Sequence, residues 1–357
     1  MNDTDDAQVE VRDGRRLSIR DVARLAGVSR GTVSRVLNDH PDVSPTSRER
    51  VKSVIAQVGY RPNPVGRALS KRSIEAIGIL IPDMAHALFM LMAEGIESVA
   101  SRHGYAVMIG NSYRQAAKEL MFGDLMSQFA VSGVLMIGAG KQSDREFSQR
   151  VCSIPTVVVG RKAAGGIFPS VTIDHCVGAK LAVEHLLKLG HRRIASVLGD
   201  PQSEAGSERQ RGYQEALRNW GMTPDPALTA GGDFEPADGM AATRHFLDLS
   251  EPPTAIFYPT DELAVGGIRI IKDRGLRVPE DVSVVSFNDT LFAEMADPPL
   301  TSVHTPAREM GVMAMQLLID LIERRGPVRD VVLGVDLVIR RSTAPPPEKN
   351  EARANSR

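Results

Sequence analysis

The sequence predicts a small all-α helix-turn-helix headpiece and a two-lobed α/β core, each lobe a doubly wound, mostly parallel sheet. The first observation is a pair of short helical patterns around a glycine within residues 18–38. The second is the alternation of apolar, strand-length runs with helical stretches after Ile74. The third is the length of 357 residues, too long for one typical domain. We expect a disordered tail at 1–16, a headpiece at 17–61, a hinge or linker at 62–72, a core at 73–342 and a disordered tail at 343–357.

The first two helices of the headpiece have recognisable ends. Ser18 suits an N-cap, and Asp21 is placed to complete a capping box. Gly27 should end the first helix, because glycine adopts the left-handed conformation of a helix C-terminus at little cost. Ser29 then suits the N-cap of the second helix. This spacing predicts two short helices joined by a tight turn.

A third helix should complete the headpiece. Ser44 suits its N-cap, Pro45 its first position and Gly59 its end. Tyr60 should pack back onto the headpiece. The apolar face of this helix consists of Val51, Val54, Ile55 and Val58.

The second helix carries residues suited to reading DNA. In a helix-turn-helix, the N-terminal residues of this helix point at base edges in the major groove. Here they are Arg30 and Gly31, with Arg35 about one turn further on. Arginine can hold guanine through two hydrogen bonds. The alternative is an ordinary helix pair with solvated arginines. The hydroxyl groups that suit phosphate contacts are those of Ser29, Thr32 and Ser34.

The distribution of charge supports a DNA-binding headpiece. Residues 17–72 contain 11 Lys and Arg against 4 Asp and Glu, although the whole chain has a net charge of −1. A basic module on a mildly acidic body is typical of modular DNA-binding proteins.

The core reads as two lobes because strand-like and helical segments alternate many times. The expected strands are 76–81, 105–109, 133–137, 156–159, 193–198, 254–258 and 282–287. The expected helices are 88–101, 117–129, 178–189, 207–220, 238–247 and 262–273. Residues 298–305 should then return the chain to the first lobe, followed by a late helix at 306–323 and a closing strand at 335–340.

One run is specific enough to suggest a family. Residues 21–38 read Asp-Val-Ala-x-x-Ala-Gly-Val-Ser-x-x-Thr-Val-Ser-Arg-Val-Leu-Asn, which resembles the signature of the lactose-repressor (LacI) family of transcription regulators. The resemblance extends from Leu17 to Pro345 and includes Gly190-His191-Arg192-Arg193-Ile194. It implies a periplasmic-binding-protein-like core. The DNA-binding residues that it implies are Ser18, Ser29, Arg30, Gly31, Thr32, Ser34, Arg35, Asn38, Asn63, Arg67 and Leu69.

The segment at 61–72 is a plain interdomain linker by composition, with two prolines and a glycine in a basic stretch. By resemblance it is the family's hinge, which folds to a short helix on operator DNA. Leu69 matches the apolar wedge that kinks DNA from the minor groove. Gly66 departs from the usual alanine, and glycine costs about 1 kcal/mol inside a helix. We therefore expect a hinge helix that forms less readily.

A ligand site is expected beyond the carboxyl ends of the strands, where doubly wound sheets bind ligands. Each candidate has a structural alternative: Phe89 and Phe234 could be core, and Arg209 could be solvated. Asp261 should mainly cap a helix. The effector-binding residues that strand ends and family resemblance imply are His86, Phe89, Arg161, Arg209, Phe234, Thr260, Asn288 and Thr305.

Departures from the family pattern indicate which ligand the site prefers. Asn288 has lost a charge that sugar-binding members often carry, and Gly160 often has an Asp counterpart. A pocket with Arg209, Arg161 and His86 but few carboxylates would tolerate an anion such as a sugar acid or sugar phosphate.

Catalysis is not expected. The first strand is followed by no Gly-x-Gly-x-x-Gly, and Gly140-Lys141 lacks the other residues of a phosphate loop. The spacing of the two cysteines, Cys152 and Cys176, suggests neither a metal site nor a disulfide framework. No cofactor is expected. There is no secretory signal or membrane-length apolar run. A cytoplasmic protein, associated with the nucleoid when bound to DNA, is expected.

These observations lead to a function. We expect a homodimer that binds near-palindromic operator DNA and is controlled by a small-molecule effector, a sugar or sugar derivative; most relatives of this kind are repressors. The alternative is a cytoplasmic small-molecule-binding protein without operator function, and a sugar-processing enzyme is a more distant one.

Overall fold

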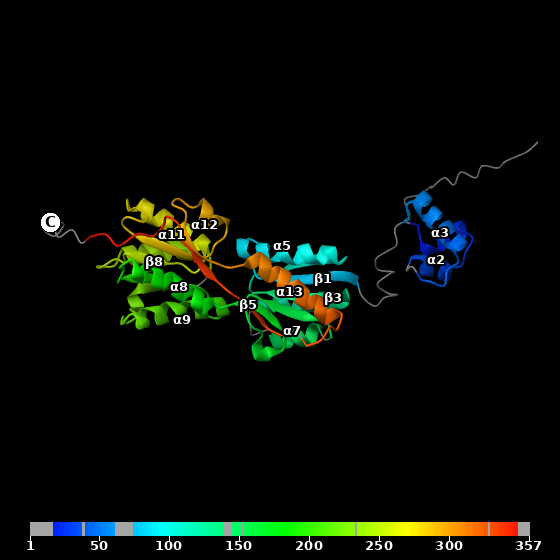
Figure 1. Ribbon diagram of the computed structural model, residues 1–357, viewed down its shortest axis with the longest axis horizontal. Coiled ribbons are helices and arrows are strands. Elements are labelled where there is room, and N and C mark those ends of the chain that lie inside the picture. Colours follow the sequence, from blue (N-terminus) through cyan, green and yellow to red (C-terminus); the bar gives the residue numbers. More distant parts are fainter. Residues whose placement is uncertain are drawn as a thin grey trace, which may run out of the picture. The chain divides into compact units, whose positions relative to one another are not determined.

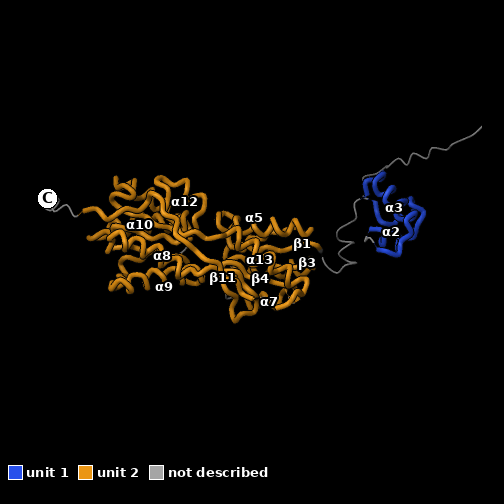
Figure 2. The backbone as a smooth tube through the Cα atoms, in the orientation of Figure 1, with its two compact units in different colours: residues 1–74 blue, residues 75–357 orange. Residues whose placement is uncertain are grey.

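The computed structural model describes residues 17–37, 40–60, 74–138, 144–151, 153–232, 234–327 and 329–348. The chain forms two compact units, residues 1–74 and 75–357 (Figure 2). The first contains the helices of the headpiece, and the second contains two α/β lobes.

The described part of the headpiece consists of α1 (Ile19–Leu25), α2 (Arg30–Leu37) and α3 (Pro45–Val58). The N–H of Ser18 donates to Oδ2 of Asp21 at 2.9 Å, as a capping box requires. Gly27 and Gly59 have φ angles of 62° and 60°, so both predicted helix ends are confirmed. The buried side chains that hold the three helices together are Val22, Ala23, Ala26, Val33, Val36, Val43, Val51 and Tyr60.

The first lobe is a six-stranded sheet with helices packed on it (Figure 1). The sheet order is β2 (Ala106–Asn111), β1 (Ile74–Ile81), β3 (Val131–Ile137), β4 (Thr156–Val159), β5 (Ser170–Ile173) and β11 (Val331–Leu333). Its helices are α5 (Ala87–Arg102), α6 (Ala116–Gln128), α7 (Asp144–Val151) and α13 (Ala307–Ile322). Helices α5 and α13 pack on each other, as do α6 and α7.

The second lobe repeats this order and differs at one edge. The sheet order is β7 (Thr229–Gly231), β6 (Ile194–Leu198), β8 (Ala255–Phe257), β9 (Ser283–Asn288), β10 (Thr301–His304) and β12 (Asp336–Val338). Strand β12 pairs antiparallel with β10, while β6, β7, β8, β9 and β10 pair in parallel. Its helices are α8 (His175–Lys188), α9 (Glu204–Asn219), α10 (Pro236–Leu247), α11 (Asp261–Asp273) and α12 (Leu291–Met295). The order reverses between β1 and β3 and between β6 and β8, which are the topological switch points.

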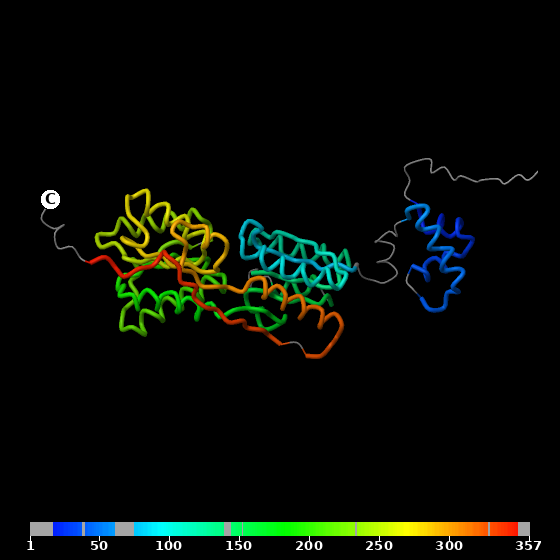
Figure 3. Tube along the Cα trace, turned by 45° about the horizontal axis from the view of Figure 1, so that its top comes forward, coloured from blue at the N-terminus to red at the C-terminus, as the bar shows by residue number. Residues whose placement is uncertain are grey.

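Along the described residues the chain passes between the lobes three times. It leaves the first lobe at Asp174, returns at residues 305–306 and leaves again at residues 334–335. Figure 3 shows the last segment, orange to red, running from one lobe to the other. These passages bring strand ends of both lobes to one region.

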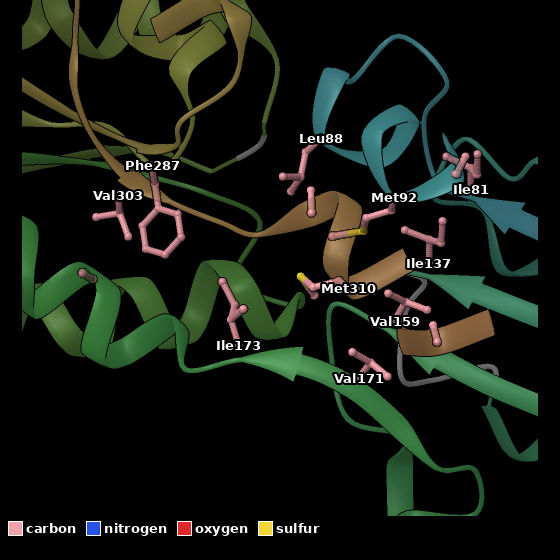
Figure 4. Packing of buried hydrophobic residues seen from close by; sticks show 14 of the residues in the cluster. Ile81, Leu88, Met92, Ile137, Val159, Val171, Ile173, Phe287, Val303 and Met310 are labelled. Atoms are coloured by element: carbon pink, nitrogen blue, oxygen red, sulfur yellow. The ribbon is translucent and has the colours of Figure 1, made fainter. Parts of the chain in front are cut away.

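Apolar packing is continuous across this junction. Met92 and Ile137 belong to the first lobe and Phe287 and Val303 to the second, and all lie in one buried cluster with Met310 of α13 (Figure 4). The lobes are therefore joined by side-chain packing as well as by the three chain segments.

Every predicted strand and helix of the core is present, with ends shifted by a few residues. Residues 301–304, predicted as part of a link, instead form β10 of the second lobe, so the return occurs at residues 305–306. No strand was predicted at β5, β7 or β11, which have only four, three and three residues. The expected tail at 343–357 begins later: Thr343 Oγ1 lies 2.9 Å from Nε2 of His185, and the N–H of Ala344 donates to Oγ of Ser283 at 3.0 Å.

Candidate functional site

A cavity of about 170 Å³ lies between the two lobes, at the carboxyl ends of their strands. Pro82, Gly138 and Gly160 follow strands of the first lobe, and Asn288 ends β9 of the second. The cavity therefore adjoins the switch points, where doubly wound sheets bind ligands. The eight predicted effector-binding residues all line it: His86, Phe89, Arg161, Arg209, Phe234, Thr260, Asn288 and Thr305.

Arg209, on α9, lies at the centre of the second-lobe wall and is 3% exposed. Its Nη1 donates to the carbonyl oxygen of Pro259, and its Nη2 donates to Oδ1 of Asn288 at 3.1 Å. Nη2 also lies 3.4 Å from Nδ1 of His175. The guanidinium stacks on Phe287, 3.7 Å from the ring centroid. These contacts fix the guanidinium while leaving its Nε without a hydrogen-bond partner among the described residues.

His175 links Arg209 to the first lobe. Its Nε2 lies 3.1 Å from the carbonyl oxygen of Gly160, which can only accept, so Nε2 carries the proton and Nδ1 accepts from Arg209. Burial first, and the charge of Arg209 second, lower the pKa of His175 to about 3. The imidazole is thus neutral at physiological pH. Burial also lowers the pKa of Arg209, which keeps its charge at neutral pH.

Asn288 is held in an uncommon backbone conformation. Asn288 and Asp289 have φ angles of 108° and 55°, in the left-handed region that costs a non-glycine residue about 1–3 kcal/mol. Asp261, which is fully buried, fixes this turn through its carboxylate. The donors to that carboxylate are Ser286 Oγ and Ser302 Oγ at 2.7 Å each, Thr290 N at 2.7 Å and Thr290 Oγ1 at 2.9 Å.

The expectation that Asp261 mainly caps a helix was wrong. Thr260 is the N-cap of α11, and its Oγ1 accepts the N–H of Leu263 at 3.4 Å. Asp261 is the first helical residue, and its side chain turns instead to the end of β9. The predicted ligand residue Thr260 thus has two roles: it lines the cavity and it caps α11.

Several polar atoms of the wall have no hydrogen-bond partner in the described part of the chain. They are Nδ2 of Asn288, Nε of Arg209, Oγ1 of Thr305 and Nδ1 of His86. All four residues are more than nine-tenths buried. Because buried polar groups are normally paired, these atoms indicate where a ligand would bind.

Arg161 lines the cavity but is engaged elsewhere. Its Nη1 and Nη2 donate to the two carboxylate oxygens of Asp144 at 2.7 and 2.5 Å, and Asp144 is fully buried. The N–H of Ala164 donates to the same carboxylate at 2.8 Å. The expectation that Arg161 offers its charge to an anionic ligand is therefore wrong, because Asp144 neutralises that charge through two parallel hydrogen bonds.

Aromatic and charged groups from the two lobes meet at the cavity. The ring of Phe89 lies 4.8 Å from the ring of His86 in the first lobe, and Nδ1 of His86 lies 3.5 Å from Oε1 of Glu262 in the second. Arg114 of the first lobe lies over the ring of Phe234 of the second, 5.4 Å from its centroid. Phe89 and Phe234 thus belong to the cavity wall.

Sequence reasoning missed several residues of the wall. Asp200, Gln202, Ser203 and Glu204 follow β6, so strand-end position could have found them. Glu119 is buried within α6 and had no such signal. The expectation of a wall with few carboxylates was wrong. The charged and titratable residues missed are Arg114, Glu119, His175, Asp200 and Glu204.

The headpiece places Arg30, Gly31 and Arg35 of α2 on its surface, while Val33 and Val36 are buried. Oγ of Ser29 caps α2 by accepting the N–H of Thr32 at 3.1 Å, and Ser34 is half-buried. The exposed Ser18 donates its hydroxyl to Asp21. The predicted contacts Asn38, Asn63, Arg67 and Leu69, with Gly66, lie outside the described residues.

No group of three or more His, Cys, Asp and Glu side chains in the described part of the chain could hold a metal ion. No helix in that part is long and apolar enough to cross a membrane.

Comparisons with known proteins match both units. A profile described as bacterial regulatory proteins, lacI family, matches residues 18–63, and a periplasmic binding protein-like domain matches residues 183–343. The repressor CytR of Escherichia coli (strain K12) is 35% identical over 327 residues, which cover 91% of this chain and 96% of CytR. Catabolite control protein A of Priestia megaterium is 35% identical over 303 residues, covering 85% and 91% of the two chains.

Solved structures show the same fold. The lac repressor dimer bound to operator and the anti-inducer ONPF has a TM-score of 0.84 at 28% identity, covering 92% of this chain and all of that one. The regulator CelR in complex with cellobiose has a TM-score of 0.70 at 33% identity, with coverage of 92% and 100%.

Proposed function

Because this chain belongs to the LacI family of bacterial regulatory proteins, we propose that it is a sequence-specific transcriptional repressor whose DNA binding is controlled by a small-molecule effector. The exposed face of α2 reads operator bases, with Arg30 and Arg35 as the base-contacting candidates. The cleft between the lobes binds the effector, a sugar or sugar derivative. Catalysis is not part of this proposal, and the protein acts in the cytoplasm, where its operator lies.

The main support for effector binding in the cleft is the set of unpaired buried polar atoms in the cavity. A core that served only to join two lobes would satisfy Asn288, Arg209 and Thr305 internally, since each unpaired buried group costs about 1–3 kcal/mol. The inter-lobe contacts at His86 and Arg114 place the same cavity where lobe movement changes its shape. A ligand there can favour one lobe arrangement and so alter operator affinity.

Exposed apolar side chains support a homodimer. They occur on both lobes, and Figure 1 shows α5 and α12 on the same side of the core. A two-fold dimer would present two headpieces to the two halves of a near-palindromic operator. The residues concerned are Met90 and Leu91 on α5, Ile109 on β2, Met121 and Leu125 on α6, and Leu291, Phe292 and Met295 on α12.

The test is DNA selection with the full-length protein. Random duplexes are enriched on the protein and sequenced, and the affinity of the selected duplex is compared with that of a shuffled duplex over a range of salt. We expect a near-palindromic consensus and a steep fall of affinity with salt. Equal affinity for selected and shuffled DNA would refute sequence-specific binding. A DNA-binding assay with no response to any cleft ligand would refute effector control.

A further inference from the structure

We propose that the effector is a polyhydroxylated carboxylic acid of sugar size, whose carboxylate binds the corner formed by Arg209, Asn288 and Thr305. This inference rests on the proposed function, because it takes the inter-lobe cavity as the effector site. It adds the chemical class of the ligand and the residues that select it.

The corner presents hydrogen-bond donors. Arg209 can only donate, and because its Nη2 donates to Oδ1 of Asn288, the amide of Asn288 must turn its NH2 group away from the guanidinium. That Nδ2, Nε of Arg209 and the hydroxyl of Thr305 have no hydrogen-bond partner among the described residues. The backbone links the three positions, since the N–H of Thr305 donates to the carbonyl oxygen of Asn288 at 3.2 Å.

A carboxylate fits this corner better than a hydroxyl group. Nδ2 of Asn288 has two hydrogens to donate, and Nε of Arg209 and Oγ1 of Thr305 have one each. An ionised carboxylate has about four acceptor sites and no hydrogen of its own, so it can accept from all of them. A sugar hydroxyl accepts from fewer donors and brings a further hydrogen, for which Thr305 is the available acceptor.

The charge of Arg209 also favours a carboxylate as the bound group. Within the described residues no carboxylate lies within ion-pair distance of its guanidinium, whose hydrogen-bond contacts are with the neutral groups of Pro259, His175 and Asn288. Arg161 on the same wall is neutralised by Asp144 at 2.5 and 2.7 Å. A buried cation without an anion in contact is costly, and a ligand carboxylate would remove that cost.

The remaining wall suits the other end of such a ligand. Asp200 and Glu204, which follow β6, and Glu119 of α6 supply carboxylate oxygens that can accept from hydroxyl groups. Met92 and Met310 supply apolar surface for the carbon skeleton. These carboxylates would repel a second negative charge, so the site favours a single carboxylate over a phosphate dianion.

The probes are matched pairs that differ in one carboxylate: D-glucose and D-glucuronate, D-galactose and D-galacturonate, and the open-chain pair ribitol and D-ribonate, with D-glucose 6-phosphate as the phosphate probe. Calorimetric titration of the full-length protein should find at least one acid that binds about tenfold or more tightly than its neutral partner. Glucose 6-phosphate should bind no better than glucose.

The deciding variant is Asn288→Asp, which is nearly isosteric. It places a carboxylate against Arg209 and removes the Nδ2 donor, so the preference for the acid over its neutral partner should fall at least about tenfold. Arg114→Gln is the matched control: it removes another cation of the wall, over Phe234, and should change that preference much less.

Binding of neutral sugars or of glucose 6-phosphate in preference to every acid would overturn the inference, as would binding of no acid at millimolar concentration. An unchanged preference for the acid in Asn288→Asp would show that the carboxylate does not bind at the corner formed by Arg209, Asn288 and Thr305. Operator binding is measured separately: an acid that binds to a protein without operator specificity would refute the proposed function and leave the ligand class standing.

Discussion

Nδ1 of His86 in the first lobe lies 3.5 Å from Oε1 of Glu262 in the second, and the two side chains are 8% and 12% exposed. Neither oxygen of Glu262 accepts a hydrogen bond from the described residues. The charged groups that also act on His86 are Arg114, Arg209 and Asp83. This contact joins the two lobes, so the protonation of His86 is linked to their separation.

We predict that acid separates the lobes. Burial lowers the pKa of His86 while the lobes are in contact, and Glu262 opposes this only in part. The separated arrangement therefore binds the proton more tightly. Contact between the lobes is favoured when the pH is above the ordinary histidine pKa of about 6.5, and it becomes less favourable as the pH falls below that value.

The measurement is a distance between spin labels on cysteines introduced at the exposed Arg102 and Arg218, in a background without native cysteines. The distance should lengthen between about pH 7.5 and 5.5. His86→Gln, which cannot be protonated in this range, should show a much smaller change. Equal lengthening in both proteins would remove His86 from the explanation.

Removal of one partner from the buried ion pair of Asp144 and Arg161 should destabilise the folded protein strongly. Arg161→Gln leaves the fully buried carboxylate without its cation, so the free energy of unfolding should fall by about 3–5 kcal/mol in urea titrations. Asp124→Asn breaks the exposed pair with Arg150, whose side chains are 40% and 47% exposed, and should cost about 0–1 kcal/mol. Similar losses in the two variants would contradict this ranking.

Asp261 should make the core less stable as the pH rises. Burial raises the pKa of Asp261 to about 6, above its value in the unfolded chain, so the folded state binds its proton more tightly. The free energy of unfolding that this group contributes is present at low pH and is lost between about pH 4 and pH 6.

Urea titrations should show that the free energy of unfolding of the natural protein falls across this pH range because of Asp261. The Asp261→Asn variant should lack this contribution. Asp248 provides the contrast, because hydrogen bonding to Arg274 lowers its pKa and its contribution is lost as the pH falls. A pH dependence that is identical in Asp261→Asn and the natural protein would show that Asp261 does not titrate in this range.

Charges on α12 should weaken the proposed dimer. Leu291 and Met295 are 64% and 75% exposed, so Leu291→Glu with Met295→Glu should leave the fold intact and place like charges at the interface. Light scattering should show a shift towards monomer, and operator affinity should fall because two headpieces no longer bind together. Arg269→Glu, at a position 76% exposed on α11, is the control. A dimer that persists in the double variant would place the interface elsewhere.

Specificity should depend on Arg35 and Arg30 of α2. If Arg35 binds a base, Arg35→Ala should cost about 1–3 kcal/mol on the selected operator and relax preference at one base position. Arg24→Ala, on the exposed side of α1, should not alter the preferred sequence. A uniform loss over all sequences would mean that Arg35 contacts phosphate.

The ends of the elements were predictable because their signals are local. Ser44, Pro45 and Gly59 determine where α3 begins and ends, through contacts within a few residues. Strand ends are also local signals, and parallel strands bring their carboxyl ends to one edge, which is why His86, Phe89, Arg161, Thr260 and Asn288 line one cavity. Arg209, Phe234 and Thr305 were predicted from the resemblance to the family, and they line the same cavity.

Whether each of those polar side chains is paired was decided only by tertiary structure. Arg161 and Arg209 were both predicted to face the ligand, yet Arg161 is neutralised by a carboxylate 17 residues away, whereas Arg209 contacts the amide of Asn288, 79 residues away. Which polar group is paired depends on the three-dimensional approach of distant segments, and burial then fixes the energetic cost of each unpaired atom. The sequence by itself therefore determined the family, the ends of the headpiece helices and eight residues of the cavity wall, while folding decided which of their donors remain for a ligand.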